Sequence, residues 1–273
     1  MIDLRSVSFR YRQDWVLQDI SFGIERGEFI GVIGPNGSGK STLLKILCRL
    51  LSPQKGEVLL DLTSLREMGQ RDIARKMAVV PQEAYSLFPF RVIEMVLMGR
   101  SPYLGHLMFE GARDFEIAKK AMDWTETLSI SERFIDELSG GERKRVFIAR
   151  ALAQEPEVIL LDEPTANLDI HHQADFLDLI LNLNREKGLT IAMASHDLNI
   201  ASEYCDRLIL LKEGRIYKVG PPREVITREN IEEVYGCRVW VDENPVSGMP
   251  RINLLKKGAH GIEALERNRT GKG

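Results

Sequence analysis

A glycine-rich segment near the N-terminus has the residue types and spacing that bind phosphate. It consists of Gly34, Pro35, Asn36, Gly37, Ser38, Gly39, Lys40, Ser41 and Thr42. Glycines let the backbone curl so that its N–H groups point at phosphate oxygens, and a following helix adds the positive end of its dipole. We expect Lys40 to reach the β- and γ-phosphates of a nucleotide, and the Ser41 hydroxyl to coordinate Mg²⁺. The alternative is a glycine turn that precedes Lys and Ser by chance.

A pair of carboxylates at the end of an apolar run suits the same chemistry. Asp162 and Glu163 directly follow residues 158–161, Val-Ile-Leu-Leu, which predict a buried strand. We expect Asp162 to hold Mg²⁺, directly or through water, and Glu163 to act as general base for the attacking water. The alternative is an ordinary strand end with solvated acids, which the glycine-rich loop makes less favoured.

A third segment, Leu138-Ser139-Gly140-Gly141-Glu142, predicts the start of a helix. Ser139 with Glu142 three residues later has the pattern of a capping box. The bare backbone at Gly140 and Gly141, at a helix N-terminus, would also suit an anion. Capping and anion binding are compatible, so the residues alone leave both interpretations open.

The apolar pattern predicts the scaffold that must bring these segments together. Alternating stretches at residues 2–9 and 16–22 predict strands, and Phe29–Ile33 predicts a buried strand that leads into the glycine-rich loop. Apolar residues at helical spacing follow this loop over residues 43–51. Residues 57–60 and 77–80 predict further strands. Strand, glycine loop and helix in this order are typical of an α/β fold.

From about residue 90 to residue 153 the pattern is helical. One helix face is predicted by Phe115, Ala118, Met122, Thr125 and Leu128. Strands and helices then alternate again, with a helix at 171–187, a strand at 190–194 and a hairpin of 207–212 with 215–219. A helical insert between two α/β portions indicates two lobes rather than two tandem domains.

In combination, these motifs resemble the ATP-binding subunit of ABC transporters over residues 2 to 235. The resemblance implies a phosphate-loop ATPase core with a mainly parallel sheet, an N-terminal antiparallel β subdomain and an inserted α-helical subdomain at about residues 90–153, within an ATPase domain of residues 1–235. It implies ATP and Mg²⁺ as ligands. It also implies a homodimer in which Ser139, Gly140 and Gly141 bind the γ-phosphate held by the opposite subunit.

The resemblance also gives roles to weaker signals. It implies that Tyr11 stacks on adenine, that Gln82 touches Mg²⁺ and the attacking water, and that His196 contacts the γ-phosphate. Asp169, within Asn-Leu-Asp, is implied to lie in a loop that crosses the dimer interface. Taken alone, Tyr11 would be a surface tyrosine and His196 a structural residue at a strand end.

Residues 98–103, Met-Gly-Arg-Ser-Pro-Tyr, resemble the subfamily that imports iron-siderophore, haem or cobalamin complexes, as do residues 169–173 and 233–236. The implied function is ATP hydrolysis that powers uptake of a metal chelate through a separate membrane permease dimer, supplied by a substrate-binding protein. The alternative for residues 98–103 is a glycine-proline loop after a helix. The adjacent pair His171-His172 resembles a metal cluster only superficially, because neighbours on a helix point apart, and we expect it on the surface or at the dimer interface.

Other functions share part of this pattern. An ABC ATPase for another substrate or for export is the first alternative, and an exporter subunit is separated only by the neighbourhood of residues 99–103. A soluble ABC ATPase that acts on DNA would carry a long coiled coil between the phosphate motifs, and one that acts on ribosomes would usually pair two such domains. Here Lys40 and Asp162 are 122 residues apart (162 − 40), with no sustained heptad between them. A phosphate-loop kinase of small metabolites would need neither Leu-Ser-Gly-Gly nor His196.

Composition narrows the partners and the compartment. The 273 residues are 44% hydrophobic and 28% charged, with a net charge of −3, so the whole-chain balance has no basic footprint for nucleic acid. No apolar run approaches the ~20 residues that span a bilayer, and residues 1–5 lack the layout of a signal peptide. The scattered cysteines, Cys48, Cys205 and Cys237, predict reduced thiols. We expect a peripheral protein at the cytoplasmic face of the membrane.

Residues 236–273 are expected to be a C-terminal extension of unassigned role. From about Pro245 the sequence has little apolar periodicity, which predicts a loose tail. Basic side chains recur in it at Lys256, Lys257, Arg267, Arg269 and Lys272. A solvated terminus is the expected reading of this charge.

Overall fold

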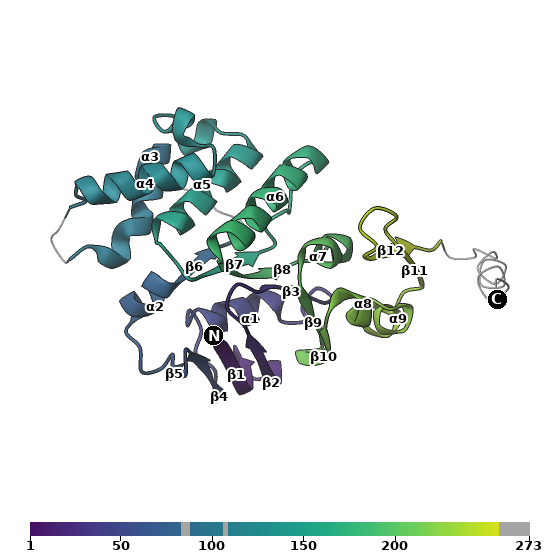
Figure 1. The fold of residues 1–273 in the computed structure, drawn as a ribbon. Coiled ribbons are helices and arrows are strands. Elements are labelled where there is room, and N and C mark those ends of the chain that lie inside the picture. The colour runs from purple at the N-terminus through teal and green to yellow at the C-terminus, as the bar shows by residue number, and fades with distance from the viewer. Residues whose placement is uncertain (83–87, 106–108, 257–273) are drawn as a thin grey trace.

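The computed structural model describes residues 1–82, 88–105 and 109–256. These residues form two lobes, one built around strands and one built of helices (Figure 1). The chain leaves the strand-containing lobe after β6 (Met77–Val80) and returns to it at β7 (Val158–Asp162). The α/β fold with an inserted helical subdomain is therefore confirmed.

A six-stranded sheet forms the centre of the larger lobe, in the order β10-β9-β3-β8-β7-β6. Neighbouring strands are parallel except for β10, which pairs antiparallel with β9 at one edge. The remaining strands are β3 (Phe29–Ile33), β8 (Thr190–Ala194), β9 (Arg207–Lys212) and β10 (Arg215–Gly220). Parallel strands covered on both faces require continuous apolar residues, and every residue of β3 and β8 is buried.

The N-terminal strands form a separate antiparallel sheet in the order β2-β1-β4-β5. Its strands are β1 (Ile2–Arg10), β2 (Trp15–Ile24), β4 (Lys55–Leu60) and β5 (Thr63–Ser64). Helix α1 (Lys40–Leu47) packs between the two sheets, because Leu43 shares one apolar cluster with Leu4 and Val32. The apolar pattern predicted helical residues as far as 51, but α1 ends at Leu47 because Arg49 takes a left-handed φ of +56°.

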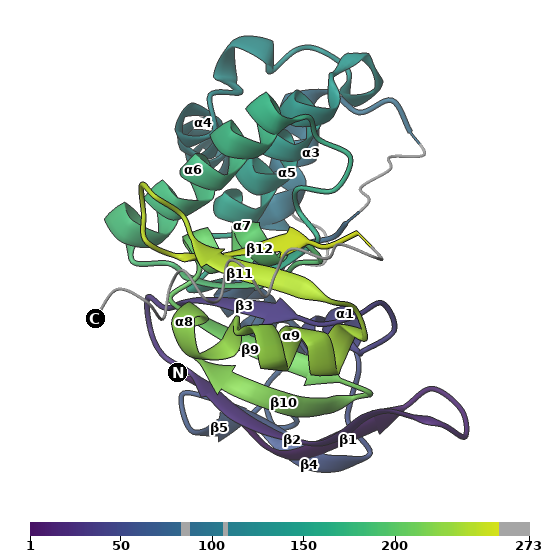
Figure 2. The same cartoon turned by 90° about the vertical axis from the view of Figure 1, so that its right-hand side faces the viewer.

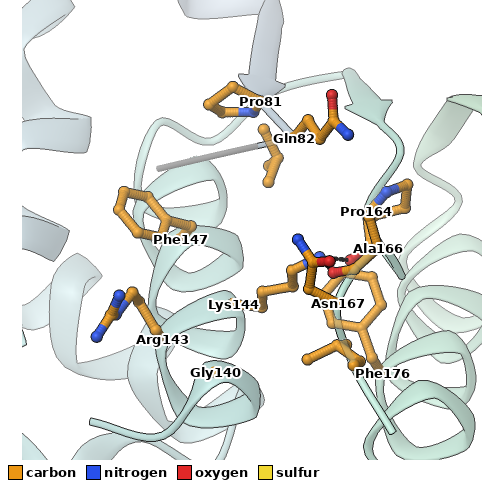
Figure 3. Close-up of a pocket in the computed structure, with 12 residues that line it drawn as sticks. Pro81, Gln82, Gly140, Arg143, Lys144, Phe147, Pro164, Ala166, Asn167 and Phe176 are labelled. Carbon is orange, nitrogen blue, oxygen red and sulfur yellow. Dashed lines mark hydrogen bonds between the residues drawn. The ribbon is translucent and has the colours of Figure 1, made fainter. Parts of the chain in front are cut away.

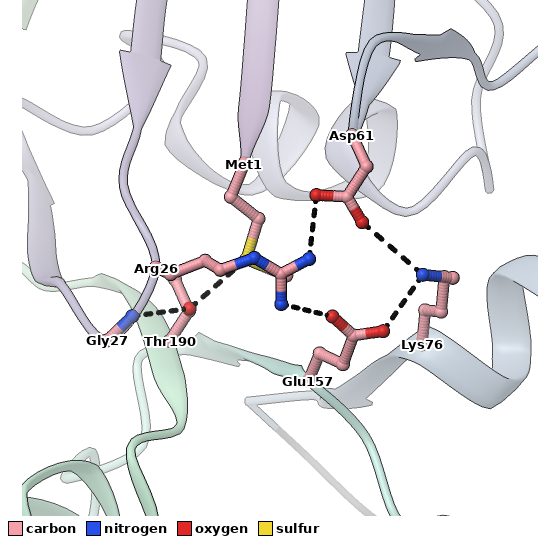
Figure 4. A network of polar contacts seen from close by, with 7 residues as sticks. All are labelled: Met1, Arg26, Gly27, Asp61, Lys76, Glu157 and Thr190. Atoms are coloured by element: carbon pink, nitrogen blue, oxygen red, sulfur yellow. Dashed lines mark hydrogen bonds and ion pairs between the residues drawn. The ribbon is translucent and has the colours of Figure 1, made fainter.

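A ring of four charged side chains joins the antiparallel sheet to the central sheet (Figure 4). Arg26 lies 2.8 Å from Asp61 and 2.6 Å from Glu157, and Lys76 lies 3.3 Å and 2.9 Å from the same two carboxylates. Lys76 ends helix α2 (Gln70–Lys76), and Glu157 precedes β7. The hydrogen bond from Lys76 is the main cause of the lowered pKa of Glu157. The ring therefore links the end of β4, the end of α2 and the start of β7 through ion pairs.

The helical lobe contains α3 (Val92–Leu97), a 3₁₀ turn η1 (Met98–Tyr103), α4 (Ala112–Trp124), two further 3₁₀ turns, η2 (Leu128–Ile130) and η3 (Ile135–Glu137), and α5 (Gly140–Ala153). The helix predicted through Leu128 stops at Trp124, because Glu126 takes a φ of +56°. Thr125 and Thr127 then satisfy each other's hydroxyl groups at 2.9 Å. No described helix is long and apolar enough to cross a bilayer.

Helices of both lobes cover the second face of the central sheet. Leu161 of β7 and Met193 of β8 share an apolar cluster with Phe147 of α5 and Ile180 of α6 (Ile170–Lys187). The shorter helix α7 (Leu198–Tyr204) follows β8, and α8 (Pro222–Val225) and α9 (Arg228–Tyr235) follow β10. Alternate residues of β7 point to opposite faces, so this sheet is the wall shared by both cores.

The C-terminal segment is more ordered than its composition predicted. β11 (Val239–Glu243) and β12 (Pro250–Leu254) form an antiparallel hairpin, which lies beside α7 and over α8 and α9 (Figure 2). The loose tail expected from about Pro245 is thus wrong for residues 250–254. The hairpin turns through Gly248, whose φ is +72° and whose N–H donates to Asn244. Lys256 is exposed, and the basic residues expected beyond it lie outside the described residues.

Candidate active site

The glycine-rich loop connects β3 to α1 and has a shape that only glycine adopts easily. Gly37 and Gly39 have φ angles of +80° and +103°. A Cβ on Gly39 would lie 2.6 Å from the Leu17 side chain, so a larger residue would displace the loop. The Lys40 ammonium folds back over the loop and donates to the carbonyl oxygen of Gly34 at 2.8 Å.

A cavity of about 200 Å³ opens at this loop, and its residues fit a phosphate ligand. It is lined by Val16, Asn36, Gly37, Gly39, Lys40, Ser41, Thr42 and Glu163. Burial lowers the pKa of Lys40, although the carboxylates of Glu163 and Asp162 oppose that effect. The Ser38 hydroxyl is buried without a hydrogen-bond partner among the described residues. A buried cation at the cavity wall suits a multiply charged anion.

Ser41 and Asp162 form the part of the site that fits a divalent cation. The Ser41 hydroxyl donates to Asp162 Oδ1 at 2.8 Å, and both are the hard oxygen ligands that Mg²⁺ takes. Burial raises the pKa of Asp162, and the hydrogen bond from Ser41 opposes the rise. The described residues contain no group of three or more His, Cys, Asp or Glu side chains suited to a metal. A cation here would take its other ligands from phosphate, water or a neutral side chain such as that of Gln82.

Three side chains from the ends of neighbouring parallel strands meet beside the cavity. Glu163, after β7, accepts a hydrogen bond from Gln82 Nε2 at 2.9 Å on its Oε2 atom. The same oxygen lies 3.4 Å from His196 Nδ1, which follows β8. Glu163 itself has a φ of +47°, and its N–H donates to Ala194. The structure thus brings together the three residues that we predicted to be catalytic.

Ser139, Gly140 and Gly141 lie elsewhere in the same chain. The Ser139 hydroxyl accepts from the Glu142 N–H at 3.2 Å, and the Ser139 N–H donates to the Glu142 carboxylate at 2.8 Å, so the capping box is present. The latter bond is the main cause of the lowered pKa of Glu142. None of the three residues lines the phosphate-loop cavity, whereas Gly140 lines a separate cavity with Gln82 (Figure 3).

Tyr11 and His171 are exposed, and His172 is half-buried. The Tyr11 side chain is 58% exposed, and its hydroxyl lies 3.4 Å from Thr42 Oγ1, at the edge of the glycine-rich loop. The rings of His171 and His172 do not point apart as expected, because their centroids are 5.5 Å apart. His172 pairs with Asp169 at 2.8 Å, and that carboxylate also caps α6 by accepting from the His172 N–H.

Residues 98–103 have a clear packing role. Arg100 is buried and contacts Asp114 at 3.0 Å and Glu155 at 2.8 Å, and its guanidinium lies 4.0 Å from the Tyr103 ring centre. A Cβ on Gly99 would collide with the backbone of α5. These residues therefore join η1, α4 and the end of α5. This packing role does not depend on the substrate class.

Sequence reasoning missed two residues that shape the loop after Glu163. Lys144 of α5 and Gln173 of α6 donate hydrogen bonds to the carbonyl oxygens of this loop. One signal was available for Lys144. The residues one helical turn away from it, Gly140 and Ile148, are not acidic, so its charge has no partner along its own helix.

The fold and the site define a class of protein, and comparison with known proteins agrees with it. Residues 17–166 match the family model described as ABC transporter. The chain belongs to the ABC transporter family and is its ATP-binding, ATP-hydrolysing cassette.

Two curated relatives extend this match over most of the chain. The ferric enterobactin transport ATP-binding protein FepC of Escherichia coli is 42% identical over 91% of this chain and 92% of its own length. The hemin import ATP-binding protein HmuV of Gloeobacter violaceus is 40% identical over 92% of this chain and 93% of its own length.

Two solved structures share the fold. One comes from a transporter assigned to the metal-chelate type, in an inward-facing conformation. Its TM-score is 0.83 at 28% identity, over 93% of this chain and 97% of that chain. The other is a dimeric ATP-binding cassette in a post-hydrolysis state with ADP and Pi. Its TM-score is 0.69 at 30% identity, over 81% of this chain and 98% of that chain.

Proposed function

We propose that this chain is the ATP-hydrolysing subunit of an importer for a metal chelate, either an iron-siderophore, haem or cobalamin complex. It works with a separate membrane permease dimer, to which a substrate-binding protein delivers the chelate, and it lies at the cytoplasmic face of the membrane. The likeness to a ferric enterobactin and a hemin import protein, and to a transporter of the metal-chelate type, supports this substrate class.

Two copies of the chain form the working unit. The observation that carries this proposal is the separation of Ser139, Gly140 and Gly141 from the cavity at Lys40 within one chain. A second copy would bring its helix N-terminus to the γ-phosphate, with Asp169 at the interface. The solved dimeric cassette of similar fold supports this arrangement.

Each residue then has a defined task. Lys40 and the backbone N–H groups of residues 34–42 hold the phosphates, and Tyr11 offers its ring to adenine. Ser41, Asp162 and Gln82 hold Mg²⁺, which when bound neutralises charge on the phosphate oxygens.

Glu163 accepts a proton from the water whose oxygen attacks the γ-phosphorus, while the bond from that phosphorus to the bridging oxygen breaks. Gln82 and His196, both in contact with Glu163 Oε2, orient its carboxylate and the γ-phosphate side of the site. Catalysis here is positioning and charge stabilisation rather than covalent chemistry.

The helical lobe is the proposed contact with the permease. An apolar cavity of about 840 Å³ lies there, lined by Phe88, Pro89, Phe90, Glu94, Leu97, Met98, Glu110 and Phe115. Phe88 and Phe115 are 67% and 41% exposed. Exposed aromatic side chains of this kind suit an apolar segment of a partner protein.

The Glu163→Gln variant tests the dimer and the role of the base together. It keeps the shape of the site but removes the proton acceptor, so turnover should fall at least ~100-fold while ATP still binds. With ATP and Mg²⁺, size-exclusion chromatography should show a stable dimer. Glu186→Gln, at an exposed position of α6, is the control and should behave as wild type. Normal turnover in Glu163→Gln would remove Glu163 from the role of base.

Co-purification with the permease tests the transport function. ATP hydrolysis by the complex in vesicles should rise when a loaded substrate-binding protein is added, across a panel of ferric siderophores, haem and cobalamin. Response to none of these would contradict the substrate class. Stimulation by DNA or RNA would instead favour a soluble ABC ATPase.

A further inference from the structure

The loop of residues 163–169 runs from Glu163 to the cap of α6, and one lysine holds its first half (Figure 3). The Lys144 ammonium donates to the carbonyl oxygen of Pro164 and, at 2.8 Å, to that of Ala166. Lys144 belongs to the second turn of α5, whose N-cap is Ser139. One side chain therefore connects the loop after the general base to the helix that begins at Ser139.

The second half of the loop is held from another helix. Gln173 of α6 donates from its amide to Leu168 at 3.0 Å and to Thr165 at 3.4 Å. Because α6 directly follows the loop, this contact is local. In the described part of the chain, Lys144 supplies the hydrogen bonds that join the loop to α5, and the Leu168 side chain also lies near Gly140 at the start of that helix.

The position of Lys144 is costly for a charged group. It forms no salt bridge with a carboxylate in the described part of the chain, and burial lowers its pKa to about 8. The negative ends of two carbonyl dipoles, those of Pro164 and Ala166, partly offset the cost of burying this charge. An apolar side chain would fill the same space without this cost, so the charge indicates that Lys144 does more than pack.

Both ends of this connection face ATP sites. Glu163 lines the phosphate-loop cavity of its own chain. Ser139 and Gly141 form the helix N-terminus that, under the proposed function, binds the γ-phosphate held by the other chain. Gly141 packs directly on the His172 ring, where a Cβ would collide, so α5 and α6 approach each other closely at this end.

We propose that Lys144 is a positioning residue that couples the two ATP sites of the dimer. When the N-terminus of α5 engages the γ-phosphate of the opposite site, Lys144 carries the adjustment of α5 to Pro164 and Ala166, and so to Glu163 of its own site. The inference rests on the proposed function, because it requires two chains that share two sites.

The Lys144→Met variant, which keeps the length but removes the donors, tests this coupling. We expect unchanged ATP affinity in the isolated chain, because Lys144 does not line the phosphate-loop cavity. We expect the kcat of hydrolysis to fall about tenfold at an unchanged KM, and the Hill coefficient for ATP to fall from above ~1.5 in wild type to about 1. Lys144→Arg should restore both, since the adjoining cavity of about 130 Å³ leaves room for a guanidinium.

Gln173→Met is the matched control, because it releases the same loop from α6 and leaves the link to α5. It should lower kcat while the Hill coefficient stays at the wild-type value. If Lys144→Met does not fold, which thermal melting will show, Lys144→Leu, which also lacks a donor, carries the same comparison.

Two outcomes are distinguishable. If Glu163→Gln traps no ATP-bound dimer and wild type shows no cooperativity, the proposed dimer is wrong. The coupling of two sites by Lys144 is then wrong as well, because it requires the dimer. If wild type is cooperative but Lys144→Met keeps its Hill coefficient, or Gln173→Met loses cooperativity to the same degree, Lys144 does not couple the sites.

Discussion

The phosphate loop and the 163–169 loop are alike in plan, since each connects a parallel strand to a helix and each has carbonyl oxygens that accept from a lysine. They differ in where the lysine comes from. Lys40 is the first residue of the helix that follows its own loop, whereas Lys144 reaches the 163–169 loop from a helix in the other lobe. The first loop is therefore complete within one stretch of chain. The 163–169 loop is held by side chains of α5 and α6, so a movement of either helix would change its conformation.

The largest expected effect concerns which chain completes each site. Ser139→Arg places a bulky cation at the N-terminus of α5, so hydrolysis should fall about 100-fold or more. A single chain should still bind ATP, because the phosphate loop is intact. Nucleotide binding and phosphate release measure the two properties separately.

Mixing this variant with Lys40→Ala sharpens the test. A mixed dimer would have one site with a sound phosphate loop and a sound opposing helix, so activity should return to about a quarter of wild type. If Ser139→Arg alone is fully active, or if it abolishes ATP binding by single chains, the two loops do not divide the work between chains.

A glycine substitution tests the claim that the phosphate loop requires a backbone conformation that only glycine adopts easily. Gly39→Ala puts a Cβ on a residue with φ +103°, against Leu17, and should cost about 1–3 kcal/mol of stability together with at least ~10-fold in ATP affinity. Gly188→Ala, at φ +65° with open space around it, should cost about 1 kcal/mol and leave ATP affinity unchanged. Urea denaturation and titration with a fluorescent ATP analogue provide both measurements. Equal affinity in the two variants would argue against a backbone-shaped site.

The same contrast explains what the sequence could predict. Gly37, Gly39, Asp162 and Glu163 are visible because the backbone of a phosphate loop and the end of a buried strand each demand particular residues in consecutive positions. The convergence of Gln82 and His196 on Glu163 follows from the order of neighbouring parallel strands, whereas the resemblance implied only the roles of these residues. The bonds of Lys144 cross the fold through one side chain and leave little local pattern in the sequence, so they were missed.

The C-terminal hairpin was missed for a related reason. Its strands are short, and the polar residues between them predict a loop rather than a strand pair. The turn through Gly248 and contacts with α7 supply what the strands themselves lack. Helix ends that came early, at Leu47 and Trp124, reflect left-handed residues that apolar periodicity does not report.

The pH dependence of Lys144 separates it from an ordinary surface lysine. Its pKa in the folded protein is lowered to about 8 from an ordinary 10.5, so the folded state releases the proton first and the unfolded chain retains it. The free energy of unfolding of wild type should therefore rise with pH through this interval relative to that of Lys144→Met. The other titratable groups are the same in both proteins, so their contributions cancel in the difference.

Activity should move in the opposite direction. Above about pH 8, loss of the charge weakens the bonds to Pro164 and Ala166, so hydrolysis by wild type should fall relative to Lys144→Arg. Urea denaturation and ATPase assays between about pH 7 and about pH 9.5 measure both trends. Parallel curves for wild type and the variants would show that this lysine is not held as described.

The smallest effect is expected where one side chain holds the C-terminal hairpin. Asn199 of α7 uses both ends of its amide on β12, accepting from the Ile252 N–H at 2.8 Å and donating to the Ile252 carbonyl at 3.2 Å. Asn199→Ala should cost about 1 kcal/mol, measured as faster amide exchange within residues 239–254. Asn182→Ala, at an exposed position of α6, should leave that exchange unchanged. If Asn199→Ala also lowers ATP hydrolysis, α7 transmits strain from the hairpin to His196, and the contrast between locally complete and externally held segments would extend to a third region.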